Sequence, residues 1–491
     1  MHLVQPRHHI SLQDYENVAT LSVTVRDLRQ EVSNLIPTLG NRRVWMVNST
    51  ARGGGVAEMM PPLITLMRDL GVEANWLVMD VADPAFFRLT KRIHNMIHGE
   101  GDTHVDDADR QLYDQISQHT ADALEQYVSP GDVLVIHDPQ PMGAGAIVRR
   151  RMDVAAIWRC HIGLDQETPH TRAAWEFLGR YTDDYDHAIF SAPEYIPGPL
   201  TGKSTVIYPT IDPLSHKNRE LPIHKLVGVL VNGSLIQPFG PVPTEQFPEP
   251  ARRLQSDGTW ALACQPEDIG LLFRPIITQV SRWDRLKGFL PLMEGFVTLK
   301  QDLTNGTVLE SRYHKTLRLA RLVLAGPDPD SIQDDPEGQE VLKEICQAYL
   351  NLPPAFQKDI AIISLPMGSA KHNALLVNAL QRCSDIVVQN SLREGFGLTV
   401  TEAMWKRVAV MGSHAVGIRQ QIRPGLDGCL VKDPEDPKEI ASILGELLRD
   451  HHKREELGNN AQRRVYNDFL IFTQVRRLFE VITEVVEARW S

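Results

Sequence analysis

Two carboxylates stand at either end of a glycine turn in the stretch REGFGLTVTEAMWK (393–406). Glu394 precedes Gly395-Phe396-Gly397, and Glu402 lies in the helix predicted from Leu398 on. Glycines let a ligand approach the backbone closely, and bare amides at a helix start bind an anion or sugar hydroxyls. A carboxylate removed from water needs hydrogen-bond donors, and a diol suits its two oxygens. The motif therefore predicts polyol binding; the alternative is one acid near a helix start and one exposed surface acid.

Two basic side chains follow a predicted strand, PIITQVS (275–281). Arg282 and Lys287, in the stretch RWDRLKG, can both turn toward one ligand. The fork of an arginine and the point charge of a lysine suit phosphate oxygens, so the pair predicts a diphosphate site. The alternative is a solvated basic loop with Asp284 as its local partner.

A third motif follows the predicted strand RVWMVNS (43–49). The chain continues through Gly53, Gly54 and Gly55 into the predicted helix that begins VAEMM. A strand, glycine loop and helix start form an anion-binding geometry, although the GxGxxG spacing of a dinucleotide fold is absent. We expect this loop to face the same diphosphate from another part of the fold.

The elements that must position these motifs form two series in which short β-branched runs alternate with helical patterns. Such alternation predicts an α/β protein with two doubly wound, Rossmann-like parallel sheets, and ligands bind at the carboxyl ends of such strands. The expected strands of the first series are 43–49, 132–138, 154–162, 187–193 and 204–210, with helices at 56–71 and 171–185. Those of the second series are 275–281, 321–326, 360–366, 385–391, 408–412 and 429–433.

The pattern divides the chain into four parts. Residues 1–217 form an N-terminal Rossmann-like domain and residues 271–460 a C-terminal one. Residues 218–270 are rich in proline and glycine and predict a connection or insertion, either a lid or subunit contact or a mobile surface excursion. Residues 461–491 predict one long helix that packs back across the domains toward the N-terminal one.

Bulk composition excludes several classes of protein. The 491 residues carry a net charge of −11, which argues against a general nucleic-acid binder. No run is apolar enough to span a bilayer and the start lacks a secretion signal, so we expect a cytoplasmic protein. Five single cysteines are typical of buried thiols in a reducing compartment and show no metal-site spacing.

Taken together, the motifs resemble the retaining glycosyltransferases of family 4, in which two glutamates are separated by seven residues, as Glu394 and Glu402 are. The resemblance extends to the trehalose glycosyltransferring synthases. It rests on the stretches VNSTARGGGVAEM (47–59), HDPQP (137–141), WRCHIGLD (158–165), YPTIDPLSHKN (208–218), PIITQVSRWDRLKG (275–288) and SLREGFGLTVTEAMWK (391–406). It implies a GT-B fold, in which two Rossmann-like domains face each other across a cleft.

The resemblance also implies roles for individual residues. The catalytic set is His161 near the donor ring, with Arg282, Lys287 and Glu394. The sequence alone favours a hydrogen-bonded histidine at a strand end for His161, and the resemblance reverses that preference. Glu402 would hold the ribose, Arg282 and Lys287 the diphosphate, and Glu394 the donor glucose. The donor site is completed by Gly53, Gly54, Gly55, Gly395, Phe396, Gly397 and Leu398. The acceptor side comprises His137, Asp138 and Gln140, and also Lys91, His94 and Asn95, for which a solvated helix face is the alternative.

The implied reaction moves glucose from UDP- or ADP-glucose to glucose, reversibly, and forms α,α-trehalose with retention. Retaining glycoside hydrolases need a nucleophile and acid pair, which is not evident here, so the resemblance favours a front-face route. No tightly bound cofactor or metal is expected, and any stimulation by Mg²⁺ would act through the free nucleotide. The alternatives are a retaining trehalose phosphorylase that uses phosphate and glucose 1-phosphate, and a catalytically silent sugar-nucleotide-binding protein.

Two departures from the family pattern bear on acceptor choice. Relatives carry an acid two residues after the histidine, where this chain has Gly163, with Asp165 as a substitute. The segment 218–270 is also longer than the usual connection and offers an interface for a homodimer. The expected partners are therefore small-molecule sugars and nucleotides, with no nucleic acid and no membrane span.

Overall fold

The computed structural model describes residues 1–6, 10–51, 55–238, 246–301, 311–329 and 336–490. The chain forms two compact units. The first combines Met1–Asp212 with Phe469–Ser491, and the second is Pro213–Asp468. Each unit is a sheet covered by helices, so the α/β architecture predicted from the alternating pattern is confirmed.

The sheet of the first unit has the strand order β1-β3-β2-β4-β5-β6-β7. β1 pairs antiparallel with β3, and the other strands run parallel. β2, β4 and β5 are buried along their whole length, as expected for parallel strands covered on both faces. The strands are β1 (His2–Val4), β2 (Val44–Asn48), β3 (Ala74–Val78), β4 (Val133–His137), β5 (Ala155–Cys160), β6 (His187–Phe190) and β7 (Ser204–Val206).

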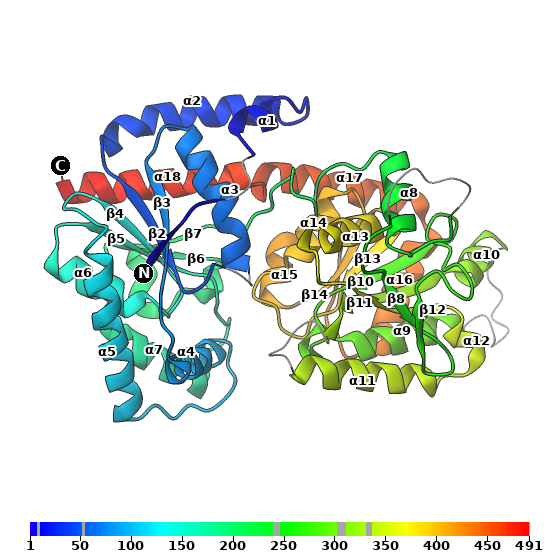
Figure 1. Ribbon diagram of the computed structural model, residues 1–491. Helices are drawn as coiled ribbons and strands as arrows, with labels where there is room; N and C mark the ends of the chain where they lie inside the picture. The colour runs from blue at the N-terminus through cyan, green and yellow to red at the C-terminus, as the bar shows by residue number, and fades with distance from the viewer. Residues whose placement is uncertain (7–9, 52–54, 239–245, 302–310, 330–335, 491) are drawn as a thin grey trace. The chain divides into compact units, whose positions relative to one another are not determined.

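Two groups of helices cover this sheet (Figure 1). α18 packs against α2, α3 and β5, whereas α4, α5, α6 and α7 pack against one another and, through α6, on β4 and β5. The helices are α1 (Leu12–Glu16), α2 (Ser22–Leu39), α3 (Gly55–Asp69), α4 (Pro84–Ile97), α5 (Asp107–Leu124), α6 (Met142–Arg151), α7 (Pro169–Thr182) and α18 (Ile471–Trp490), with single turns η1 (Pro193–Tyr195) and η2 (Gly198–Lys203).

The sheet of the second unit has the order β15-β14-β13-β10-β11-β12-β8-β9. Its first six strands are parallel, and the hairpin of β8 and β9 continues the sheet antiparallel beyond β12. The strands are β8 (Arg252–Leu254), β9 (Trp260–Leu262), β10 (Ile276–Val280), β11 (Arg321–Pro327), β12 (Ile360–Leu365), β13 (Ile386–Gln389), β14 (Ala409–Ser413) and β15 (Cys429–Val431).

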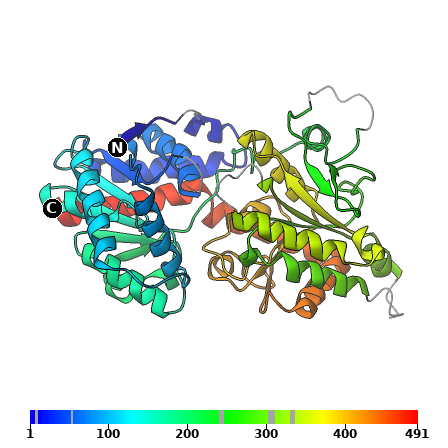
Figure 2. The ribbon, with the colours of Figure 1, turned by 60° about the horizontal axis from the view of Figure 1, so that its bottom comes forward.

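Helices pack on this second sheet (Figure 2). A separate apolar core lies on each of its two faces. One contains residues of α9 and α16, and the other contains residues of α8 and α13. The helices are α8 (Ile223–Asn232), α9 (Phe289–Gln301), α10 (Ser311–Leu319), α11 (Pro336–Leu350), α12 (Pro354–Gln357), α13 (Ala370–Arg382), α14 (Leu398–Trp405), α15 (Val416–Gln421), α16 (Pro437–Arg449) and α17 (His451–Asp468), with the turn η3 (Arg285–Lys287).

The segment 218–270 belongs to the second unit, and the crossing between the units lies before it, at Asp212–Pro213. Its helix α8 buries Leu226 and Leu230 against α13, and its hairpin β8–β9 extends the sheet. The composition of the segment hides this role, because frequent proline and glycine predict loops. The short strands at the sheet edge carry too few residues for a periodic signal.

The chain end forms two helices rather than the one predicted over 461–491. α17 ends at Asp468 and α18 begins at Ile471. Between them the backbone pairs with the other crossing segment: the Ile211 amide donates to the Phe469 carbonyl at 2.9 Å, and the Ile471 amide donates to the Ile211 carbonyl at 3.0 Å. Phe469 and Leu470 are fully buried apolar residues, so the apolar pattern of the sequence continues without a gap between the two helices. The break in the helix comes from the backbone pairing with Ile211.

Replacing Phe479 by Ala tests whether α18 holds the first unit together. Phe479 is fully buried, and such a truncation costs about 3 to 5 kcal/mol. Hydrogen exchange of the most protected β4 and β5 amides should therefore accelerate by about a hundredfold or more. The control is Phe87→Ala, since Phe87 is 40% exposed on α4. Equal exchange in the two variants would contradict the role given to α18.

Candidate functional site

The chain order of the second sheet reverses between β10 and β13, which are neighbours although β11 and β12 lie between them in sequence. In open α/β sheets, ligands bind outside the carboxyl ends of the strands at such a reversal. The segment 281–288 leaves β10 here and the segment 390–397 leaves β13. These two segments contain the predicted diphosphate and glycine motifs, so the topology brings the two motifs together.

An ion pair joins the two segments. Nζ of Lys287 lies 2.7 Å from Oε2 of Glu394, and the two side chains are 13% and 14% exposed. The same oxygen also accepts hydrogen bonds from Ser391 at 3.2 Å and Gln389 at 3.4 Å. A ligand oxygen that enters this point would therefore meet a cation and a carboxylate that are already held in place.

Gly288 allows the two segments to meet this closely. Its φ is +63°, and a Cβ at this position would overlap the backbone carbonyl of Asn390. Asp284 caps the preceding turn, since its carboxylate accepts from the Leu286 amide at 2.8 Å. Among the described residues Asp284 pairs with neither predicted cation, so the alternative in which it is their partner is wrong.

The glycine turn lies between β13 and α14. Gly397 has a φ of +81° and stands immediately before α14. α15 supports the turn from behind: the Gly417 amide donates to the Glu394 carbonyl at 3.1 Å, and the Gln421 amide group donates to the carbonyls of Phe396 and Gly397. A Cβ on Gly417 would overlap the backbone of Gly395 and Phe396. The turn is therefore held by a helix that the sequence motif does not include.

Glu402 is buried on α14, with 6% of its surface exposed, so the alternative of an exposed surface acid is wrong. Nζ of Lys217 lies 3.7 Å from its carboxylate. Lys406, one turn further along, donates to the Glu402 carbonyl oxygen at 3.0 Å. Burial lowers the pKa of the Lys406 ammonium to about 7. Lys217 therefore faces the carboxylate of Glu402 and Lys406 its backbone carbonyl, and the ribose contact of Glu402 stays a prediction.

Arg282 occupies an exposed position directly after β10. No ion pair or hydrogen bond holds it within the described part of the chain. Arg285, in the same loop, forms two hydrogen bonds of 2.6 and 2.7 Å with Glu344 on α11. The three basic residues of this loop therefore differ: Lys287 pairs with Glu394, Arg285 pairs elsewhere, and Arg282 extends to solvent.

The first sheet reverses its chain order between β2 and β4. Gly53 and Gly54 follow β2 but lie outside the described residues; Gly55 begins α3 and is exposed. His137 is the last residue of β4, and His161 follows β5. Nδ1 of His137 lies 3.0 Å from Nε2 of His161. The topology therefore also brings together His137, which was predicted for the acceptor side, and His161, which was predicted to lie near the donor ring.

Asp138 links this pair to the backbone. It has a φ of +62°, and its carboxylate accepts from the His161 amide at 2.9 Å. Loss of water raises the pKa of the Asp138 carboxyl to about 6, although the His161 amide and Arg159 act in the opposite direction. Desolvation, with Arg159 nearby, holds the pKa values of His137 and His161 well below their usual value. Both imidazoles are therefore neutral at pH 7.

No described hydrogen bond or ring contact joins the remaining predicted acceptor residues to His137 or His161. Gln140 is partly exposed beyond β4. On α4, Lys91 is exposed, whereas His94 and Asn95 are partly buried, and the His94 ring packs on His98 with centroids 4.9 Å apart. The two regions meet through Gly99, which packs against Leu164 in the loop after His161.

The structure explains the glycine at position 163. A Cβ there would overlap the ring of Tyr195, which is buried in the turn η1. An acidic side chain therefore does not fit at this position while Tyr195 keeps its place. Asp165 is partly exposed two residues further along.

Sequence reasoning missed several residues that support the site. They are Arg159, Lys217, Gln389, Ser391, Lys406, Gly417 and Gln421. Lys406 had a detectable signal, because it follows Glu402 at the i,i+4 spacing that places two residues on one helix face. Gly417 and Gln421 had none, since their role depends on how α15 packs on a distant turn.

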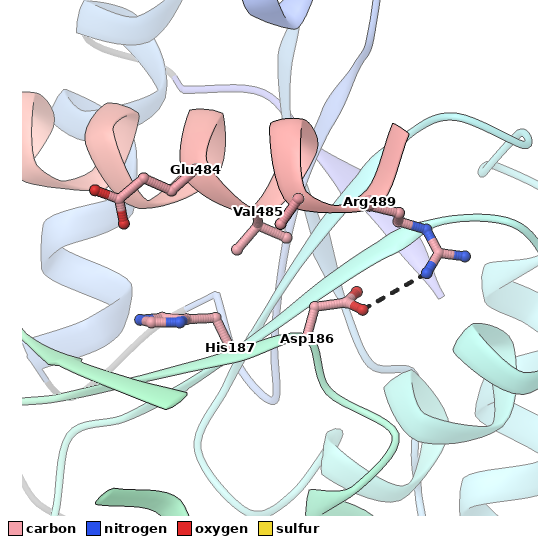
Figure 3. A pocket seen from close by; sticks show the side chains of 6 residues that line it. Asp186, His187, Glu484, Val485 and Arg489 are labelled. Carbon is pink, nitrogen blue, oxygen red and sulfur yellow. Dashed lines mark ion pairs between the residues drawn. The ribbon is translucent and has the colours of Figure 1, made fainter. Parts of the chain in front are cut away.

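Other features of the described residues do not add to this chemistry. A hollow of about 490 Å³ opens between α18 and the amino end of β6, at the opposite edge of the first sheet (Figure 3). Asp186, Glu484 and Arg489 line it, and Arg489 pairs with Asp186 at 3.6 Å. The described residues contain no group of three or more His, Cys, Asp or Glu side chains placed to hold a metal ion. Nor does any described helix combine the length and apolar character of a membrane span.

Comparison with known proteins identifies similar chains. A model of the trehalose synthase N-terminal domain matches residues 46–197, and a model of glycosyl transferases group 1 matches 367–464. The trehalose synthase of Pyrococcus horikoshii is 32% identical over 96% of both chains. The trehalose phosphorylase of Pleurotus pulmonarius is 25% identical over 87% of this chain and 55% of that protein.

Solved structures are similar in fold at lower identity. A UDP-forming α,α-trehalose-phosphate synthase from Burkholderia xenovorans superimposes with a TM-score of 0.63 at 16% identity and covers 91% of this chain and 99% of that one. This likeness shows the GT-B fold class that the sequence predicts.

A methyl group at Gly417 tests how α15 supports the glycine turn. Gly417→Ala should displace Gly395 and Phe396, because backbone atoms occupy the space of the new Cβ. Overpacking of this size costs about 1 to 3 kcal/mol; if the turn holds a nucleotide as predicted, affinity for UDP or ADP should fall by about 5-fold to 150-fold in calorimetry. Gly179→Ala is the matched control, since a Cβ there meets open space on α7. Unchanged affinity in Gly417→Ala would separate the turn from nucleotide binding.

Proposed function

The chain belongs to the trehalose synthase family of glycosyltransferases, and on this premise we propose that it transfers glucose from a nucleoside diphosphate glucose to free glucose, forming α,α-trehalose. The observation that supports the proposal most directly is the Lys287–Glu394 pair at the reversal point of the second sheet. A cation suits the diphosphate, and a carboxylate suits the hydroxyls of the transferred sugar. The proposal includes retention of the donor's anomeric configuration.

The donor half of the reaction breaks the bond between the anomeric carbon and the diphosphate oxygen. Negative charge then develops on the diphosphate while the anomeric carbon becomes cationic. Lys287 and Arg282 would stabilise the departing charge, and groups held in place before the reaction do this without reorganising. Arg282 is suited to this role because it is exposed and uncommitted to an ion pair among the described residues, unlike Arg285.

In the second half of the reaction, a hydroxyl oxygen of the acceptor glucose bonds to the same face of the anomeric carbon. The acceptor proton passes to the leaving diphosphate, so charge and atoms balance without an enzyme nucleophile. The contact between Asp138 and His161 supports placing the reacting centre here, because it brings a carboxyl from the loop after β4 next to the residue after β5, whose imidazole is neutral. Glu402 would bind the ribose, with Lys217 and Lys406 beside it. The proposed chemistry draws its positive charge from the protein and uses Mg²⁺ only through the free nucleotide.

An acceptor panel tests the substrate assignment. The protein is incubated with UDP-glucose or ADP-glucose and with glucose, glucose 6-phosphate, fructose or water. We expect release of the nucleoside diphosphate and formation of a non-reducing disaccharide with glucose, and the reverse reaction from trehalose plus the diphosphate. Absence of product with glucose would overturn the proposal. Absence of product with every acceptor would leave the phosphorylase or a silent nucleotide-sugar binder.

The same assay distinguishes the phosphorylase, whose relatives match this chain at lower identity. Trehalose incubated with inorganic phosphate would then yield glucose 1-phosphate. A phosphorylase has no ribose to bind, so Glu402→Gln would leave its rate unchanged. Under our proposal, Glu402→Gln weakens nucleotide binding, because a buried carboxylate that accepts from ribose hydroxyls is lost.

Lys287→Ala tests the role of the cation, with Arg285→Ala as its matched control. Both residues lie in η3, but Arg285 forms its ion pair with Glu344 at the surface. Loss of one preorganised donor typically lowers kcat about 100-fold to 1,000-fold, which we expect for Lys287→Ala. Arg285→Ala should stay within about threefold of wild type, since exposed pairs contribute little. Similar rates for both variants would contradict the phosphate role of Lys287.

A further inference from the structure

Arg159 is an unusual residue to find inside a sheet. It lies in the interior strand β5 with 1% of its surface exposed, and its Nη1 and Nη2 are buried with no hydrogen-bond partner among the described residues. A buried charge without partners is costly, so such a group calls for an explanation. Desolvation lowers the pKa of this guanidinium only to about 10, so Arg159 remains a cation at neutral pH.

The strand register places this cation beside the histidine pair. Arg159 is the direct neighbour of His137 across the parallel strands β4 and β5, and paired residues of parallel strands point to the same face. Nε2 of His137 is also buried, and no described residue forms a hydrogen bond with it. The buried nitrogens without partners on β4 and β5 thus belong to one cation and the adjacent imidazole.

The two imidazoles form a straight hydrogen bond. Their rings lie within 9° of parallel with centroids 5.3 Å apart, while Nδ1 of His137 and Nε2 of His161 are 3.0 Å apart. Rings in face-to-face contact would have much closer centroids at this nitrogen separation, so the two rings meet edge to edge in one plane. One nitrogen must donate and the other must accept, since both imidazoles are neutral.

Arg159 decides which nitrogen donates. We infer that it is a positioning residue that fixes the tautomers of this pair, so that His161 presents Nδ1–H outward as a donor to a substrate oxygen. The guanidinium attracts a lone pair on Nε2 of His137. It would repel an N–H at that position, because the guanidinium carries only hydrogen-bond donors. His137 must then carry its proton on Nδ1 and donate to Nε2 of His161, which leaves the His161 proton on Nδ1.

The outward direction follows from burial. His137 is fully buried, whereas His161 is partly exposed. In the described part of the chain, Nδ1 of His161 is not one of the side-chain nitrogens that are buried without a hydrogen-bond partner. Asp138 holds the backbone of His161 through the 2.9 Å hydrogen bond, so the ring keeps its direction. The use of this donor on a sugar hydroxyl or a diphosphate oxygen rests on the proposed function, but the tautomers do not.

Long-range ¹H–¹⁵N correlation spectra of the full protein with ¹⁵N-labelled histidine, recorded at pH 7 without substrate, test the inference. The chain has 18 histidines, and loss of signals in His137→Gln and His161→Gln assigns the two rings. We expect both rings to be protonated on Nδ1 and not on Nε2. A wild-type His161 protonated on Nε2 overturns the inference, whatever activity the protein has.

Arg159→Met replaces the cation with an apolar side chain, whereas Arg159→Lys keeps a cation at this position. We expect the spectrum of Arg159→Met to show a mixture of tautomers. Its kcat should be lower by about tenfold or more, and its KM for the donor should stay within about twofold of wild type. Arg159→Lys should restore the wild-type spectrum, which a packing role alone would not predict. An unchanged spectrum in Arg159→Met overturns the inference; if that variant does not fold, the wild-type spectrum decides.

Discussion

The ion pair between Lys287 and Glu394 depends on the convergence of parallel strands at the point where a sheet reverses its chain order. The two residues are 107 positions apart in sequence, yet their charged atoms are 2.7 Å apart. Each side chain is largely removed from water, which is costly for an unpaired charge, so the pair and its bonds from Ser391 and Gln389 hold both charges in place. The proposed donor site depends on this arrangement, because the glycine turn and α14 follow directly after the pair.

Glycines without contact to the predicted ligand make the arrangement possible. Gly288 allows the β10 loop to touch the β13 loop, and Gly417 allows α15 to press against the turn. In both positions a Cβ would overlap backbone, which cannot rotate away as a side chain can. The site thus depends on close backbone packing as much as on its charged side chains.

The polar groups at the strand ends of the first unit are arranged differently. Instead of an ion pair, this unit carries two neutral imidazoles in a straight hydrogen bond beside a buried arginine. Burial removes the proton from the histidines, while the guanidinium keeps its own. A retained cation next to neutral rings gives the pair a direction. Tyr195 fills the neighbouring space at Gly163, so the packing of η1 decides which side chains fit there.

The sequence alone determined the two alternating series of strands and helices and the motifs at their strand ends, because periodicity and glycine positions are local properties. It did not show α8 or the β8–β9 hairpin within 218–270. It placed Lys287, Glu394 and His161 correctly at the ends of strands. Only the tertiary structure decided which charges pair, that Glu402 is buried, and that the last helical pattern breaks at Phe469. It also revealed that the buried guanidinium of Arg159 has two nitrogens with no hydrogen-bond partner among the described residues, which the strand pattern of the sequence does not show. Partner choice depends on which strand ends converge, and that convergence follows from strand order and packing, which no local pattern encodes.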